Sequence, residues 1–72
     1  MSNVENYLMT WDDSSEEPWS IRLGMDGNYT LFAGTFPSGD IIGRYRNFVD
    51  AHKRLKHEAL MLGASVRKEN TG

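Results

Sequence analysis

The sequence predicts an α+β domain, in which a small antiparallel β-meander of three or four strands carries one C-terminal helix on one face. The segment 47–63 has the apolar spacing of an amphipathic helix. The segment 19–33 alternates in hydrophobicity on either side of an Asp-Gly turn. A sheet with one apolar face and a helix with one apolar stripe bury those surfaces against each other.

The 72 residues are expected to form a single domain over 1–72, with an ordered core of about residues 7–63. Residues 1–6 and 64–72 are polar, and we expect both ends to be flexible. Tyr7 to Trp11 alternates weakly and is predicted to be an edge strand. Residues 12–18 are predicted to form a loop, because they hold four carboxylates, two serines and a proline.

The segment 19–33 is predicted to be a hairpin whose register follows from its pattern. A two-residue loop at Asp26-Gly27 would mix apolar and polar side chains on both faces of the hairpin. A three-residue loop over 25–27 places Gly27 in the left-handed conformation, and we prefer it. That register puts three pairs on one face: Leu23 with Tyr29, Ile21 with Leu31, and Trp19 with Ala33.

A second turn is predicted at 36–39, where proline and glycine suit the required geometry. Residues 41–46 are then predicted to return as a fourth strand. In that strand Ile41 and Tyr45 face the core, and the side chains that face outward are Ile42, Arg44 and Arg46. The alternative is a helix that begins near Asp40, against which Gly43 counts.

The helix itself is predicted to run from Phe48 to Leu62. Asn47 is a good N-cap and Gly63 can adopt the left-handed conformation of a C-terminal cap. One stripe is predicted to face the sheet, and it consists of Phe48, His52, Leu55, Ala59 and Leu62.

The composition excludes several classes of protein. The chain has no cysteine, so disulfides and thiolate zinc sites are excluded. His52 and His57 are five residues apart and point away from each other on a helix, so they cannot share a metal ion. No catalytic motif or phosphate-binding loop is present, and we expect a protein that is not an enzyme and has no cofactor. A cytoplasmic location and no membrane association are expected, because no segment resembles a signal peptide or a membrane span.

Charge is unevenly distributed along the chain. Residues 1–40 contain seven carboxylates and one arginine, whereas residues 41–72 contain seven basic residues and three carboxylates. The acidic loop is the first candidate site, and its proposed contact residues are Trp11, Asp12, Asp13, Glu16 and Glu17. Tryptophan can anchor an interface and carboxylates can steer its approach, so the loop favours a protein partner with a basic surface.

The outer sheet face is the second candidate, with Arg22, Phe32, Arg44 and Arg46 as its possible nucleic-acid contacts. Guanidinium groups bind phosphates and base edges, and aromatic rings stack on bases. The order of a meander followed by a helix, over residues 19–62, resembles the AP2-type and integrase arm-binding domains. That resemblance implies a sheet lying in the major groove of DNA.

The last helical turn is the third candidate, because Leu60 and Met61 exceed what one buried face needs and can form a homodimer contact. The hypothesis favoured by these patterns is a small binding protein that docks on a protein partner and occludes it. In size and character the chain is similar to phage or mobile-element inhibitors of host machinery, such as anti-CRISPR proteins. The alternatives are the nucleic-acid module and the structural homodimer.

Overall fold

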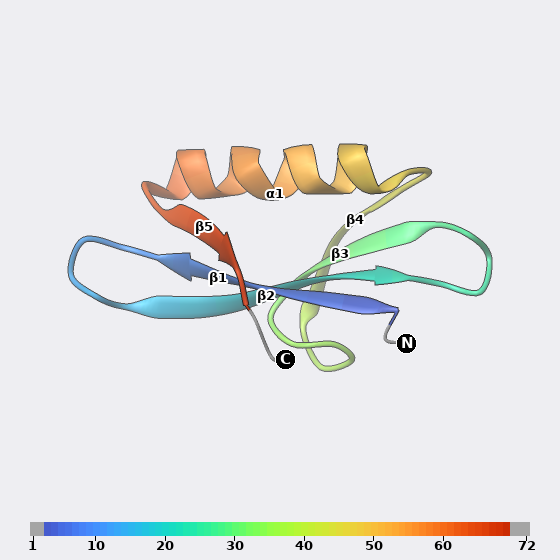
Figure 1. Cartoon of the computed structure of the whole chain (residues 1–72), viewed down its shortest axis with the longest axis horizontal. Helices are drawn as coiled ribbons and strands as arrows, with labels where there is room; N and C mark the ends of the chain where they lie inside the picture. The colour runs from blue at the N-terminus through green and yellow to red at the C-terminus, as the bar shows by residue number, and fades with distance from the viewer. Residues whose placement is uncertain (1–2, 70–72) are drawn as a thin grey trace.

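A computed structural model describes residues 3–69 and shows an antiparallel sheet of five strands with one helix against one face (Figure 1). Along the chain the elements are β1 (Val4–Thr10), β2 (Glu16–Leu23), β3 (Tyr29–Ala33), β4 (Asp40–Tyr45), α1 (Phe48–Leu62) and β5 (Ser65–Lys68). The strand order in the sheet is β4-β3-β2-β1-β5. The predicted α+β class is confirmed, with five strands in place of three or four.

The β2–β3 hairpin has the predicted register. Ile21 pairs with Leu31, and the last ladder pair before the turn joins Leu23 to Tyr29. The amide of Gly24 donates to the carbonyl of Asn28 at 2.9 Å, which leaves residues 25–27 as the loop. Gly27 has a φ of 83°, the left-handed conformation that such a loop needs at its last residue.

The helix begins and ends where its caps predict. The side chain of Asn47 accepts from the amide of Asp50 at 2.9 Å. At the other end Gly63 has a φ of 71°, and its amide donates to Leu60 while that of Ala64 donates to Ala59. Within residues 3–69, no helix has the length and apolar character that crossing a bilayer requires.

The core lies between α1 and the face of the sheet that α1 covers. Its buried side chains are Tyr7, Met9, Trp19, Ile21, Leu31, Ala51, Leu55 and Ala59. The prediction that Leu62 belongs to the buried stripe is wrong, because this side chain is 50% exposed at the end of the helix. The buried stripe ends one turn earlier, at Ala59.

β1 is an inner strand, so the prediction of an edge strand at residues 7–11 is wrong. It pairs with β2 on one side and with β5 on the other. The strands extend beyond the predicted ordered range of 7–63, because β1 begins at Val4 and residues 65–68 form β5. Residues 1–2 and 70–72, whose flexibility was also predicted, lie outside the described residues.

Residues 41–45 form a strand, as predicted, but two of their side chains face the opposite way. Leu31 pairs with Gly43 and Phe32 pairs with Ile41, which leaves Ile42 as an extra residue in a β-bulge. A bulge inverts the alternation beyond it. Ile41 is therefore 55% exposed on the outer face, and Ile42 packs partly buried against the core.

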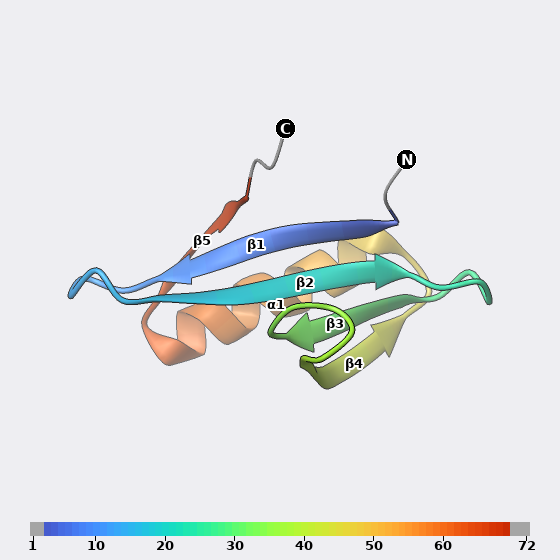
Figure 2. The same ribbon diagram turned by 90° about the horizontal axis from the view of Figure 1, so that it is seen from below.

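The outer face of the sheet, opposite α1, is covered at its centre by the loop of residues 34–39. This loop passes below the sheet in Figure 1 and crosses in front of it in Figure 2. The hydroxyl of Ser20 on β2 donates to the carbonyl of Gly34 at 3.0 Å. The ring of Phe36 packs edge-on against Phe32 with centroids 5.5 Å apart. The outer face, which the sequence offered as a nucleic-acid surface, is therefore covered at its centre by the chain itself.

Candidate functional site

The turn between β1 and β2 and the C-terminal end of α1 lie at the same end of the molecule (Figure 1). The indole Nε1 of Trp11 donates a hydrogen bond to the carbonyl of Leu62 at 2.9 Å. Trp11 is half-buried and also packs against the core. The bond places the acidic turn beside the exposed helix end. We call the two segments together the docking end, which comprises residues 11–13, 17 and 60–62.

The acidic turn is short and closed by its own hydrogen bonds. The amide of Trp11 donates to the carbonyl of Ser15 at 3.1 Å, and Ser14 adopts a φ of 70° at the tip. The carboxylate of Asp13 accepts from both the amide and the hydroxyl of Ser15. These bonds lower the pKa of Asp13 below its ordinary value. Asp12 and Asp13 are both exposed, so the tip presents negative charge to solvent.

Glu16, Glu17 and Pro18 belong to β2, and the predicted loop over residues 12–18 is therefore too long at its C-terminal end. Both glutamates are exposed. Glu17 pairs with Met9 and shares the face of the sheet on which α1 lies. Glu16 is on the opposite face, where its carboxylate lies 3.5 Å from the guanidinium of Arg67. The structure thus brings three of the four carboxylates to the tip or the helix side, and Glu16 to the other side.

The helix end is apolar and open to solvent. The exposed fractions are 76% for Leu60, 70% for Met61 and 50% for Leu62. These three residues follow Ala59, the last buried residue of the helix. Contiguous exposed apolar side chains of this size commonly mark a contact surface.

The four residues predicted to contact nucleic acid fall into two groups. Arg44 and Arg46 are exposed. Arg22 has its guanidinium 4.7 Å from the centre of the Phe36 ring, and Phe32 is only 6% exposed beneath that ring. Arg22 and Phe32 are therefore engaged within the chain, whereas a base-stacking surface needs open rings.

A hollow lies between α1 and the strands β1 and β5, and no pattern in the sequence predicted it. His52 is half-buried there, with its ring 5.6 Å from the rings of both Tyr7 and Phe48, whereas His57 is exposed. The carboxylate of Glu5 accepts from the hydroxyl of Tyr7 at 3.1 Å. Residues two apart on a strand share one face, so a strand that includes Glu5 places it beside Tyr7. The predicted strand began at Tyr7 and left Glu5 out. Within residues 3–69, no three His, Asp or Glu side chains are grouped as a metal site would require.

Comparison with protein-family models, curated proteins and solved structures found no match to this chain. The function proposed below therefore follows from the exposure, contacts and charges of the chain's own side chains.

Proposed function

We propose that the protein is a non-enzymatic binding module that docks on a protein partner through the docking end and occludes a basic surface there. The observation that carries the proposal is the hydrogen bond from Trp11 to Leu62, which holds an acidic turn beside an apolar helix end. Interfaces combine an apolar centre with a polar rim in this way. The protein would act as an inhibitor, since covering the partner's surface needs no chemistry.

The two parts of the docking end have different roles. Leu60 and Met61 would enter an apolar recess of the partner, because burying exposed apolar area is the main source of binding free energy. Asp12, Asp13 and Glu17 would face lysine or arginine side chains around that recess. Such charges mainly speed association and select the partner. The partner is therefore a protein surface with an apolar centre and a basic rim.

The negative charge of the docking end argues against a second copy of the chain and against a nucleic acid as its partner. In a two-fold homodimer the same patch meets itself, so both copies would bring carboxylates and no lysine or arginine of the docking end to the interface. A nucleic acid would bring phosphates toward the same carboxylates. Both arrangements place like charges together, whereas a basic protein surface neutralises them.

The proposal can be tested by calorimetric titration with a helical peptide of leucine and lysine. The leucines of this peptide form an apolar stripe, and its lysines flank the stripe with positive charge. Neutralising Asp12, Asp13 and Glu17 to Asn or Gln should weaken binding by a factor between about three and 150, since exposed ion pairs contribute about 0.2–1 kcal/mol each. Asp12→Lys should weaken binding more than Asp40→Lys, because Asp40 is also exposed but lies on β4, at the far edge of the sheet from β5. Equal affinity in the neutralised variant would contradict the proposal.

A further inference from the structure

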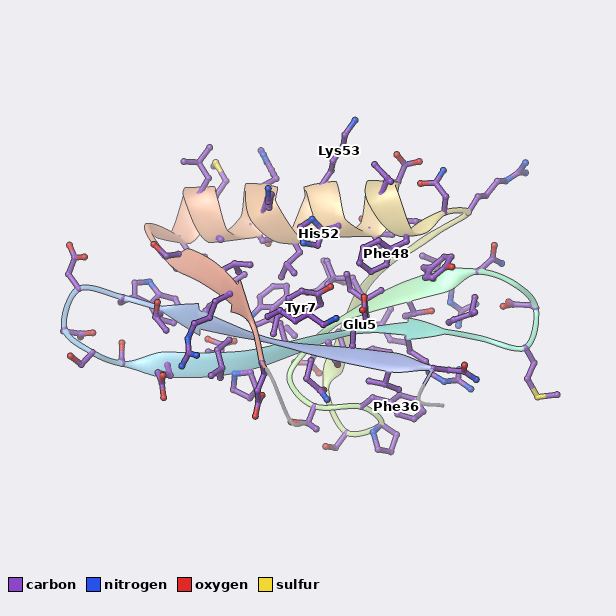
Figure 3. The ribbon with its side chains drawn as sticks, viewed as in Figure 1. Glu5, Tyr7, Phe36, Phe48, His52 and Lys53 are labelled. Atoms are coloured by element: carbon purple, nitrogen blue, oxygen red, sulfur yellow. The ribbon has the colours of Figure 1, made fainter. Side chains whose placement is uncertain are left out.

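A hollow of about 340 Å³ opens between residues 48–56 of α1 and the neighbouring strands β1 and β5. Its lining includes Glu5, Tyr7, Phe48, His52, Lys56 and Lys68. Figure 3 shows Glu5 and Tyr7 on the sheet side of this space, with Phe48 and His52 facing them from the helix. A neighbouring hollow of about 220 Å³ shares Glu5 and Phe48 with the first, so the two adjoin.

The helix wall of this hollow is a row of three side chains. Phe48, His52 and Lys56 are spaced four residues apart, which places them one above another on one side of α1. The rings of Phe48 and His52 stack with centroids 5.6 Å apart and an angle of 28° between their planes. Both rings are half-buried, so each presents part of its surface to the hollow. A planar apolar group has two rings to pack against here.

The charges around the hollow leave one cation without a counterion. The carboxylate of Glu5 lies 2.9 Å from the ammonium of Lys68 and is balanced by it. The guanidinium of Arg67 is 3.5 Å from Glu16. Within residues 3–69 Lys56 has no hydrogen-bond or ion-pair partner. The hollow therefore offers an aromatic wall that ends in an uncompensated positive charge.

We propose that this hollow binds a small aromatic carboxylate. The ring of the ligand lies against Phe48 and His52, and its carboxylate reaches the ammonium of Lys56. The volume of 340 Å³ falls at the lower end of the range of about 300–1,000 Å³ typical of small-molecule sites, which fits a ligand with a single ring. The site is separate from the docking end, because the two share no residue: the helix side chains of the hollow lie within 48–56, and those of the docking end within 60–62.

The test is a titration of isotopically labelled protein with 3-phenylpropionate, followed by amide chemical shifts. Saturable shifts are expected at Glu5, Tyr7, Phe48 and His52 by about 10 mM ligand, and the uncharged 3-phenylpropanamide should bind more weakly. Lys56→Gln should weaken binding about 1.4-fold to fivefold, which is the range of an exposed ion pair of about 0.2–1 kcal/mol. The matched control is Lys53→Gln, because Lys53 is exposed and points away from the sheet (Figure 3).

Three results would overturn the proposal. The first is the absence of saturable shifts at the residues of the hollow. The second is equal affinity of Lys56→Gln and the unchanged protein. The third is equal binding of the acid and its amide, which would leave the carboxylate without a role. Because Lys56 is exposed on the helix, the Lys56→Gln variant is expected to remain folded, and the amide spectrum of the free variant checks this.

Discussion

The indole nitrogen of Trp11 donates to the carbonyl oxygen of Leu62 at 2.9 Å, and the two residues are 51 positions apart in the chain. The last carbonyls of a helix have no partner within the helix. In α1 those of Ala59 and Leu60 accept from Ala64 and Gly63. The bond from Trp11 satisfies the carbonyl of Leu62 and ties the β1–β2 turn to the helix.

Trp11→Phe keeps an aromatic ring but removes this hydrogen bond. We expect the free energy of unfolding to fall by about 1 kcal/mol, the usual net value of one hydrogen bond. Urea denaturation followed by circular dichroism measures the loss. Amide hydrogen exchange should also become faster at Gly63 and Ala64. Unchanged stability and exchange would show that the bond does not join the two segments in solution.

Leu55 and Leu60 provide a matched pair on one helix. Leu55 is fully buried, so Leu55→Ala leaves a cavity and should cost about 2–5 kcal/mol, which is a large part of the stability of a small domain. Leu60 is 76% exposed, and Leu60→Ala should change stability by less than about 0.5 kcal/mol. Thermal and urea unfolding of the two variants compare them directly. A larger loss from Leu60→Ala would place the buried face of α1 elsewhere.

Local signals explain which parts of the fold the sequence predicts. Asn47 and Gly63 mark the two ends of the helix, and Asp26-Gly27 with its flanking alternation determines one register. Strand β5 has no such signal. It is four residues long, Val66 is its only apolar residue, and its partner strand β1 begins at Val4. Pairing between segments so distant in sequence depends on the assembled sheet, not on a local pattern.

The candidate site was predictable in its parts but not in its arrangement. The exposed carboxylates of Asp12 and Asp13 and the surplus apolar residues Leu60 and Met61 can be read from the sequence. Their proximity cannot, because it depends on a contact between residues 51 positions apart. The burial of Phe32 was also missed, since a loop that folds back over the outer face has no periodic signature.

Tyr7 should make the protein sensitive to alkaline pH. Burial and the nearby charge of Glu5 raise the pKa of Tyr7 well above its ordinary value of about 10. Above pH 10 the unfolded chain releases this proton while the folded chain holds it, so stability falls as the pH rises. In Tyr7→Phe this contribution is absent, and stability should fall less between about pH 9 and 11. If the free energies of unfolding of the two proteins fell in parallel over this pH range, Tyr7 would not have a raised pKa in the folded state.

Glu5 should make the protein sensitive to acid. The hydrogen bond from Lys68, with a smaller one from Tyr7, lowers the pKa of Glu5 below its ordinary value. The folded state therefore gains stability from ionised Glu5 above about pH 4.5, and this gain is lost as the pH falls through the lowered pKa. Urea midpoints of Glu5→Gln and the unchanged protein should converge as the pH is lowered. If the difference between the two urea midpoints grew toward acid pH, the contact between Glu5 and Lys68 would not be the source of the stability.

The most direct test of the docking end is to map where the leucine–lysine peptide binds, using amide chemical shifts of the labelled protein. If the acidic turn and the helix end are one surface, Asp12, Asp13, Leu60 and Met61 should shift together and yield one Kd. Arg44→Ala combined with Arg46→Ala should leave that Kd unchanged, because both arginines lie outside the docking end. Shifts confined to one of the two segments, or centred on the outer face of the sheet, would contradict the account.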